Sequence, residues 1–69
     1  MRVSYKKLWV LLAQKEMSKA ELRKAAGIAA STLTKLNKNE YIALSILVKI
    51  CDALDCDFGD IMERVSQDE

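Results

Sequence analysis

The sequence contains no histidine and no proline, and only two glycines and two cysteines occur among its 69 residues. Without histidine, the side chain that most often serves as a general base or a metal ligand is missing, which argues against most hydrolases. Two glycines, Gly27 and Gly59, are too few for a glycine-rich loop that cradles phosphates. The sequence also offers no nucleophile paired with a base. We therefore expect a protein that is not an enzyme, uses no cofactor and has no small-molecule substrate.

The two cysteines, Cys51 and Cys56, are too few for a tetrahedral zinc site, and no histidine completes one. Both stand at apolar positions, so we expect buried free thiols in a reducing compartment, with a disulfide or redox switch as the alternative. The acidic side chains near the end of the chain lack the spacing of a calcium loop, so capping and solvation are expected of them rather than metal binding. These are Asp52, Asp55, Asp57, Asp60 and Glu63.

Long hydrophobic runs are also missing. No apolar stretch approaches 18 residues, and the start of the chain lacks the small-residue cleavage site of a signal peptide. We therefore expect a cytoplasmic protein without a membrane partner. With 51% apolar and 30% charged residues, the chain is typical of one compact helical domain over residues 1–69, close to the size at which an unaided core suffices.

The charge is distributed unevenly along the chain. Residues 1–39 carry nine lysines and arginines against two acids, a net charge of +7, whereas residues 40–69 carry two against eight, a net charge of −6. Two ordinary solvated faces would also give this pattern. However, the positive half includes the most informative segment, residues 18–39, and a basic surface there favours nucleic acid as a partner.

Residues 18–26 show the pattern of a short amphipathic helix. Ser18 can accept a hydrogen bond from an orphan backbone N–H, and Glu21 can complete a capping box. Gly27 follows the last turn, where a left-handed backbone is cheapest without a Cβ. The side of this helix that faces the core is expected to carry Ala20, Leu22, Ala25 and Ala26.

A second helix is expected over residues 30–37, with one buried and one exposed stripe. Ile28 would anchor the preceding turn in the core, and Asn39 stands where a left-handed cap often ends a helix. The buried stripe consists of Ala29, Leu33 and Leu36. The opposite stripe is basic and bears hydroxyls, and it consists of Ser31, Thr34, Lys35 and Lys38.

Three further helices account for the rest of the chain, over residues 4–15, 44–54 and 58–64. Ser4 would cap the first, and Asp57 would cap the last in a capping box with Asp60. Residues 1–3 could form a basic arm. Tyr5 and Trp9 spread the apolar surface of the first helix to its flank, so they are candidates for a dimer surface, although a large aromatic such as Trp9 more often belongs to the core.

The segment 18–39 resembles the helix-turn-helix of the Cro and phage-repressor type, also called the XRE family. The resemblance is carried by Ser18, Leu22, Ala26-Gly27-Ile28, Thr32-Leu33, Lys35-Leu36 and Asn39, and it extends to Leu44, Leu47, Ile50, Leu54 and Ile61. It implies an all-α, five-helix lambda-repressor-like domain whose second and third helices form the helix-turn-helix. It also implies sequence-specific binding of double-stranded DNA by a small transcriptional regulator of bacterial or phage type.

The sequence departs from this family pattern at three places. Lys19 replaces the usual glutamine at the start of the second helix, which keeps a phosphate contact but makes it a point charge. Arg23 replaces an alanine and can snorkel or reach DNA. Ala29 and Ala30 stand where a polar cap and a long polar base reader are usual, so direct base readout is expected to be reduced.

The resemblance lets us assign residues of the segment 18–39 to expected contacts with DNA. Base edges are assigned to Ala30, Ser31, Thr34 and Lys35. The sugar–phosphate backbone is assigned to Lys19, Arg23, Lys38 and Asn39. Two copies could pair as a homodimer on a two-fold symmetric site. The alternative is a helical protein-interaction module, such as an antitoxin or adaptor, in which DNA binding is weak or lost.

Overall fold

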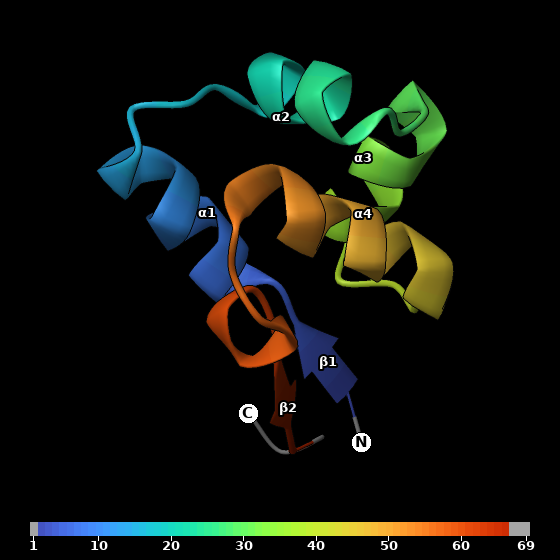
Figure 1. Ribbon diagram of the computed structural model, residues 1–69. Helices are drawn as coiled ribbons and strands as arrows, with labels where there is room; N and C mark the ends of the chain where they lie inside the picture. Colours follow the sequence, from blue (N-terminus) through green and yellow to red (C-terminus); the bar gives the residue numbers. More distant parts are fainter. Residues whose placement is uncertain (1, 67–69) are drawn as a thin grey trace.

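The computed structural model describes residues 2–66 of the chain. Over these residues the backbone forms four α-helices, one turn of 3-10 helix and one pair of antiparallel strands (Figure 1). The helices are α1 (Lys6–Gln14), α2 (Lys19–Ala26), α3 (Ala30–Asn37) and α4 (Leu44–Leu54), and the 3-10 turn is η1 (Phe58–Asp60). The strands are β1 (Arg2–Ser4) and β2 (Glu63–Val65).

The start of the chain differs from the prediction. Ser4 lies in β1, and α1 begins at Lys6 after Tyr5, so the expected helix over 4–15 is shorter at both ends. The Ser4 hydroxyl still accepts a hydrogen bond from the Lys6 N–H at 3.3 Å. Arg2 and Val3 form a strand rather than an arm, because β2 supplies a partner for their backbone. Met1 lies outside the described residues.

The prediction of a fifth helix over residues 58–64 is also wrong. The capping box of Asp57 and Asp60 forms as predicted, but it begins a single 3-10 turn. Ile61 then enters the core with no exposed surface, and the chain continues into β2. The backbone N–H and C=O groups of residues 63–65 therefore form hydrogen bonds with β1 instead of extending a helix. As a result, the two ends of the described chain lie side by side (Figure 1).

The two central helices begin and end where the sequence predicts. The Glu21 N–H donates to the Ser18 hydroxyl at 3.1 Å, and the Glu21 carboxylate accepts from the Ser18 N–H at 2.9 Å, which confirms the capping box. Gly27 is left-handed with φ 67° and ends α2. Ala20 and Ala25, expected on the inner side of α2, are both exposed, because Leu22 and Ala26 alone face the core.

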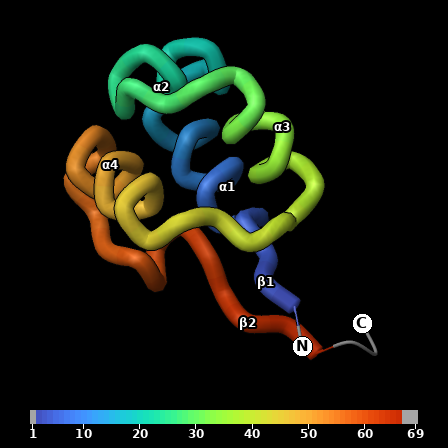
Figure 2. Tube along the Cα trace, turned by 90° about the vertical axis from the view of Figure 1, so that its right-hand side faces the viewer, coloured from blue at the N-terminus to red at the C-terminus, as the bar shows by residue number. Residues whose placement is uncertain are grey.

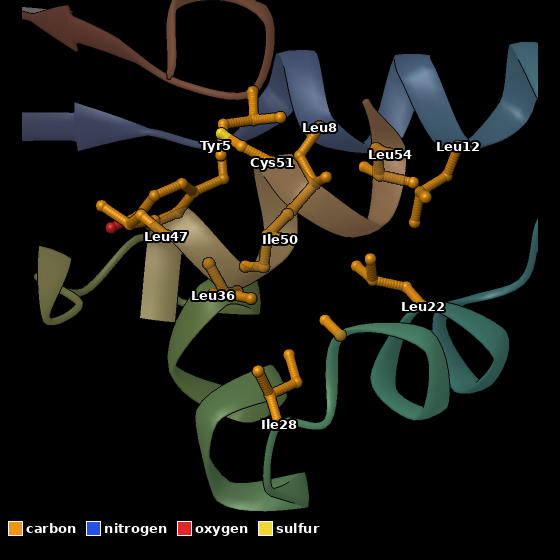
Figure 3. Packing of buried hydrophobic residues seen from close by; sticks show 12 residues of the cluster. Tyr5, Leu8, Leu12, Leu22, Ile28, Leu36, Leu47, Ile50, Cys51 and Leu54 are labelled. Carbon is orange, nitrogen blue, oxygen red and sulfur yellow. The ribbon is translucent and has the colours of Figure 1, made fainter. Parts of the chain in front are cut away.

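The core is formed where all four helices meet (Figure 3). Leu8 of α1, Leu22 of α2, Leu36 of α3 and Ile50 of α4 each have no exposed surface. The buried stripe of α3 is narrower than predicted, since Leu33 is half-buried and Ala29 is exposed. One face of α3 is thus held against the molecule, and most of its circumference is left open. Over the described residues, no helix combines the length and the apolar character needed to cross a bilayer.

Candidate nucleic-acid interface

The four residues assigned to base edges lie together on the outer face of α3. Ala30, Ser31, Thr34 and Lys35 are all exposed, and their spacing places them on one side of a helix. Leu36 is fully buried on the other side of α3, and Ile28 anchors the preceding turn with 5% of its surface exposed. The helix therefore presents these side chains outward from a fixed backbone.

The hydroxyl of Thr34 is already engaged within the helix. Its Oγ1 donates to the carbonyl oxygen of Ala30 at 3.2 Å. Such a bond uses the hydroxyl proton and leaves the oxygen able to accept. Thr34 is therefore suited to receive a hydrogen bond from a base amino group, whereas Ser31 can offer either role.

Lys35 and Lys38 bring positive charge to the end of α3. Both are exposed, Lys35 in the last turn and Lys38 at the position that ends the helix. Cations are favoured there, because the last carbonyl groups of a helix carry partial negative charge. The cations thus stabilise the end of the same helix whose face is open to a ligand.

Lys19 lies at the start of α2 and reaches two other helices. Its Nζ is 4.1 Å from the centre of the Trp9 ring in α1 and donates to Asn37 Oδ1 of α3 at 2.6 Å. Arg23 is exposed one turn further along α2. The start of α2 and the end of α3 therefore lie next to each other, and the charge of Lys19 lies between them.

Asn39 has a structural task that the sequence did not reveal. Its backbone is left-handed with φ 57°, as predicted, and its Oδ1 accepts a hydrogen bond from the Tyr5 N–H at 3.1 Å. The Tyr5 hydroxyl in turn donates to the carbonyl oxygen of Glu40 at 2.8 Å. Of the Asn39 side chain, the amino group is the part that remains for a phosphate, because the amide oxygen is bonded to Tyr5.

The proposed dimer surface on α1 needs correction. Tyr5 is 1% exposed and belongs to the core (Figure 3), so it offers no surface to a second copy. The reason is its place before α1, where its ring enters the core and its hydroxyl reaches the segment between α3 and α4. Trp9 is half-buried against the core and lies under Lys19. Nothing in the sequence near Tyr5 signalled this arrangement.

The thiols and an acidic part of the chain lie away from α3. Cys51 is buried and Cys56 half-buried, both as free thiols, and burial raises the pKa of Cys51 to about 11. The last turn of α4 and η1, in and beside which stand Asp52, Asp55, Asp57 and Asp60, lie on the opposite side of the molecule from α3 (Figures 1 and 2). The outer face of α3 is thus separated from these two acidic segments.

Comparison with known proteins agrees with this geometry. A family model described as the Cro/C1-type HTH DNA-binding domain matches residues 7–67. This chain belongs to that family. It is 42% identical over 62 residues to the uncharacterized HTH-type transcriptional regulator YozG of Bacillus subtilis, a match covering 87% of this chain and 74% of the relative. The crystal structure of transcriptional regulator VanUg is similar with a TM-score of 0.92 and 53% identity, over 96% of this chain and 88% of that one.

Within the Cro/C1-type family, the unit formed by α2, Gly27 and α3 is the helix-turn-helix, so the resemblance identified from residues 18–39 is confirmed. The family carries DNA binding as its function. In this member, the outer face of α3 begins with two short side chains, Ala30 and Ser31, and its positive charge is concentrated toward the end of the helix at Lys35 and Lys38.

Proposed function

We propose that this protein regulates transcription by binding double-stranded DNA with α3 in the major groove. The observation that carries the proposal is the outer face of α3, whose side chains are exposed while Leu36 holds the helix to the core. The exposed residues are Ala30, Ser31, Thr34 and Lys35. A helix of this width fits the major groove of B-form DNA. The two relatives described above bear the names of transcriptional regulators, which supports the regulatory role.

The side chains of this face divide by the contact that each one can make. Lys35 is assigned to guanine, because an ammonium can donate to O6 and N7. Ser31 and the acceptor oxygen of Thr34 contact neighbouring base edges, and the methyl group of Ala30 packs on a thymine methyl. Lys19, Arg23, Lys38 and the amino group of Asn39 contact phosphates and set the register without reading sequence.

Because the side chains assigned to bases are short, one copy reads few bases, and two copies on a two-fold symmetric site would supply the remaining specificity. Their half-sites would lie about one helical turn apart, roughly 34 Å. Sequence-dependent DNA shape adds to this readout. Sedimentation of the protein with a selected duplex tests the pairing, since a stable complex of one copy with full affinity would contradict it.

Selection of duplexes from a random pool tests the proposed function directly. We expect a consensus with two-fold symmetry. If about four lysines or arginines per copy neutralise phosphates, the logarithm of the affinity should fall against the logarithm of the salt concentration with a slope of about −3.6 for each copy bound. The absence of measurable affinity for any duplex at low salt would overturn the proposal and favour a protein-interaction module instead.

A further inference from the structure

A groove of about 770 Å³ lies between the strand pair and the segment that joins α3 to α4. In Figure 2, α3 and the strands lie on the same side of the molecule, with this segment between them. One wall of the groove belongs to the strands and the other to the segment that leaves α3. Its lining includes Arg2, Ser4 and Val65 on one wall and Lys38, Glu40 and Tyr41 on the other.

The register of the strands decides which side chains share a face. Arg2 pairs with Val65 and Ser4 with Glu63, whereas Val3 pairs with Arg64. Because side chains alternate along a strand and paired residues share a face, one face carries Arg2, Ser4, Glu63 and Val65, and the other carries Val3 and Arg64. Val3 is half-buried against the core, and Arg2 is exposed. Arg2 and Val3 both line the groove, and of these two only Arg2 is exposed.

The two walls of the groove are tied together by Tyr5. This residue directly follows β1, and its N–H and hydroxyl bond the side chain of Asn39 and the carbonyl oxygen of Glu40 at 3.1 and 2.8 Å. Tyr5 is 1% exposed, and both bonds are partly buried. Such a connection holds the end of β1 at a set distance from the residues that follow α3, and the groove is preorganised.

The chemistry of the groove fits a phosphodiester backbone. Arg2 and Lys38 supply two cations from opposite walls, and guanidinium groups bind phosphate through two parallel hydrogen bonds. Tyr41 is 78% exposed and adds a phenol ring, and Ser4 adds a hydroxyl. Two acids oppose phosphate binding and weaken the contact, Glu40 in the lining and Glu63, which pairs with Ser4 and so lies on the face of the strands that carries Arg2.

We propose that this groove binds the sugar–phosphate backbone beside the half-site that α3 reads, with Arg2 as a phosphate-binding residue. The groove is continuous with the α3 face through Lys38, which belongs to both. The proposal rests on the proposed function, because the duplex must first be placed by α3. With this contact, the interface covers DNA beyond the bases that α3 contacts, and β1 becomes part of the interface.

Two duplexes of the selected site test this inference, one ending at the edge of the half-site and one extended by about half a helical turn, roughly five base pairs, on each side. Affinity is measured by fluorescence anisotropy over a range of salt concentrations. For each copy bound, Arg2→Ala should lower the magnitude of the salt slope by about 0.9 on the extended duplex and leave it unchanged on the short one. Arg2→Lys should retain the slope, since one cation remains.

Arg64→Ala is the matched control, because it removes the same charge from the same strand pair on the opposite face. It should leave the slope on both duplexes unchanged. Glu40→Gln removes the opposing charge and should tighten binding to the extended duplex. Circular dichroism melting of each variant shows whether the fold is retained.

Equal behaviour of Arg2→Ala and Arg64→Ala, or an equal loss from Arg2→Ala on both duplexes, would overturn the inference. A change in self-association without a change in salt slope would assign the groove to contact between copies and would overturn it too. These outcomes are distinct from failure of the proposed function, in which neither duplex would be bound by the unaltered protein.

Discussion

The ammonium of Lys19 lies 4.1 Å from the centre of the Trp9 ring, and the same nitrogen donates a 2.6 Å hydrogen bond to Asn37. A cation over an aromatic face at an exposed site contributes about 0.5–1 kcal/mol to stability. Lys19 therefore helps to hold α1, α2 and the end of α3 together before any DNA is bound, and its proposed phosphate contact would draw on the same charge.

Replacing Lys19 with methionine separates these two tasks. Lys19→Met keeps most of the apolar stem, and we expect it to lower the free energy of unfolding by about 0.5–1 kcal/mol as the ring contact is lost. It should also weaken binding to all duplexes alike and reduce the magnitude of the salt slope by about 0.9. Urea unfolding and a salt titration measure the two effects, and an unchanged slope would leave Lys19 with its structural task alone.

Trp9 provides a direct signal for the same contact, because it is the single tryptophan of the chain. If a phosphate attracts the Lys19 ammonium, the environment of the ring changes, and its fluorescence should change as duplex is added. Lys19→Met should remove most of this change. Lys24→Met, on the same helix, is the control and should leave it intact. Equal fluorescence changes in both variants would argue against movement of Lys19.

Lys35 and Lys38 lie three residues apart at the end of α3 and are predicted to act differently. Lys35→Ala should cost about 1–3 kcal/mol of binding free energy at the preferred site and relax one base preference, because its ammonium contacts a base edge. Lys38→Ala should weaken all sequences similarly, because it contacts a phosphate. Affinities for the selected site and for single-base variants measure the difference. A uniform loss from Lys35→Ala would contradict its assignment to a base.

The buried thiol of Cys51 predicts how stability depends on pH. Burial, reinforced by the neighbouring Cys56, raises the pKa of Cys51 from its ordinary value of 9.0 to about 11. Between these values the unfolded chain has released the proton and the folded chain retains it, so stability falls as the pH rises. The free energy of unfolding should be independent of this group below pH 9 and should fall by up to about 1.4 kcal/mol per pH unit between pH 9 and about 11.

Urea unfolding at pH 8, 9 and 10 measures this dependence. Burial also raises the pKa of Tyr5 and that of Cys56, and both act in the same direction. Cys51→Ala is therefore expected to reduce the steepness of the fall without abolishing it, even though the lost packing lowers stability at every pH. The same steepness in the variant and the unaltered protein would show that Cys51 does not titrate in this range.

The parts of the fold that the sequence predicted depend on partners close along the chain. The capping box joins Ser18 to Glu21, three residues away, and the left-handed backbone of Gly27 follows from the missing side chain. The exposed face of α3 follows from helical periodicity alone. The helix-turn-helix and its outward residues were therefore accessible from local patterns, and family resemblance added to them.

The parts that were missed depend on contacts between distant residues. Residues 63–65 form a strand because β1, about sixty positions earlier, offers its backbone. Tyr5 is buried because Asn39 and Glu40, more than thirty residues away, accept its hydrogen bonds. The groove beside α3 depends on both arrangements. No periodicity or capping signal within a short window carries this information, since the competing helix over residues 58–64 satisfies the same local pattern.

Glu16 and Asn39 both have a left-handed backbone, and we predict that replacing each with glycine changes the free energy of unfolding in opposite directions. Glu16 has φ 55° just after α1, and glycine relieves the strain of a side chain there and removes an acid from a helix C-terminus. Glu16→Gly should therefore raise the free energy of unfolding by about 0.5–1 kcal/mol, after the entropic cost of glycine.

Asn39 has φ 57°, but asparagine tolerates this region well, so glycine relieves little strain at that position. Asn39→Gly instead deletes the amide oxygen that accepts the Tyr5 N–H, and it should lower the free energy of unfolding by about 0.5–1.5 kcal/mol. Urea unfolding of both variants and of Glu16→Ala, which keeps the strain, measures the difference. Stabilisation by both glycines would mean that backbone strain outweighs the Tyr5 bond, and the wall of the groove would then owe its position to packing rather than to Asn39.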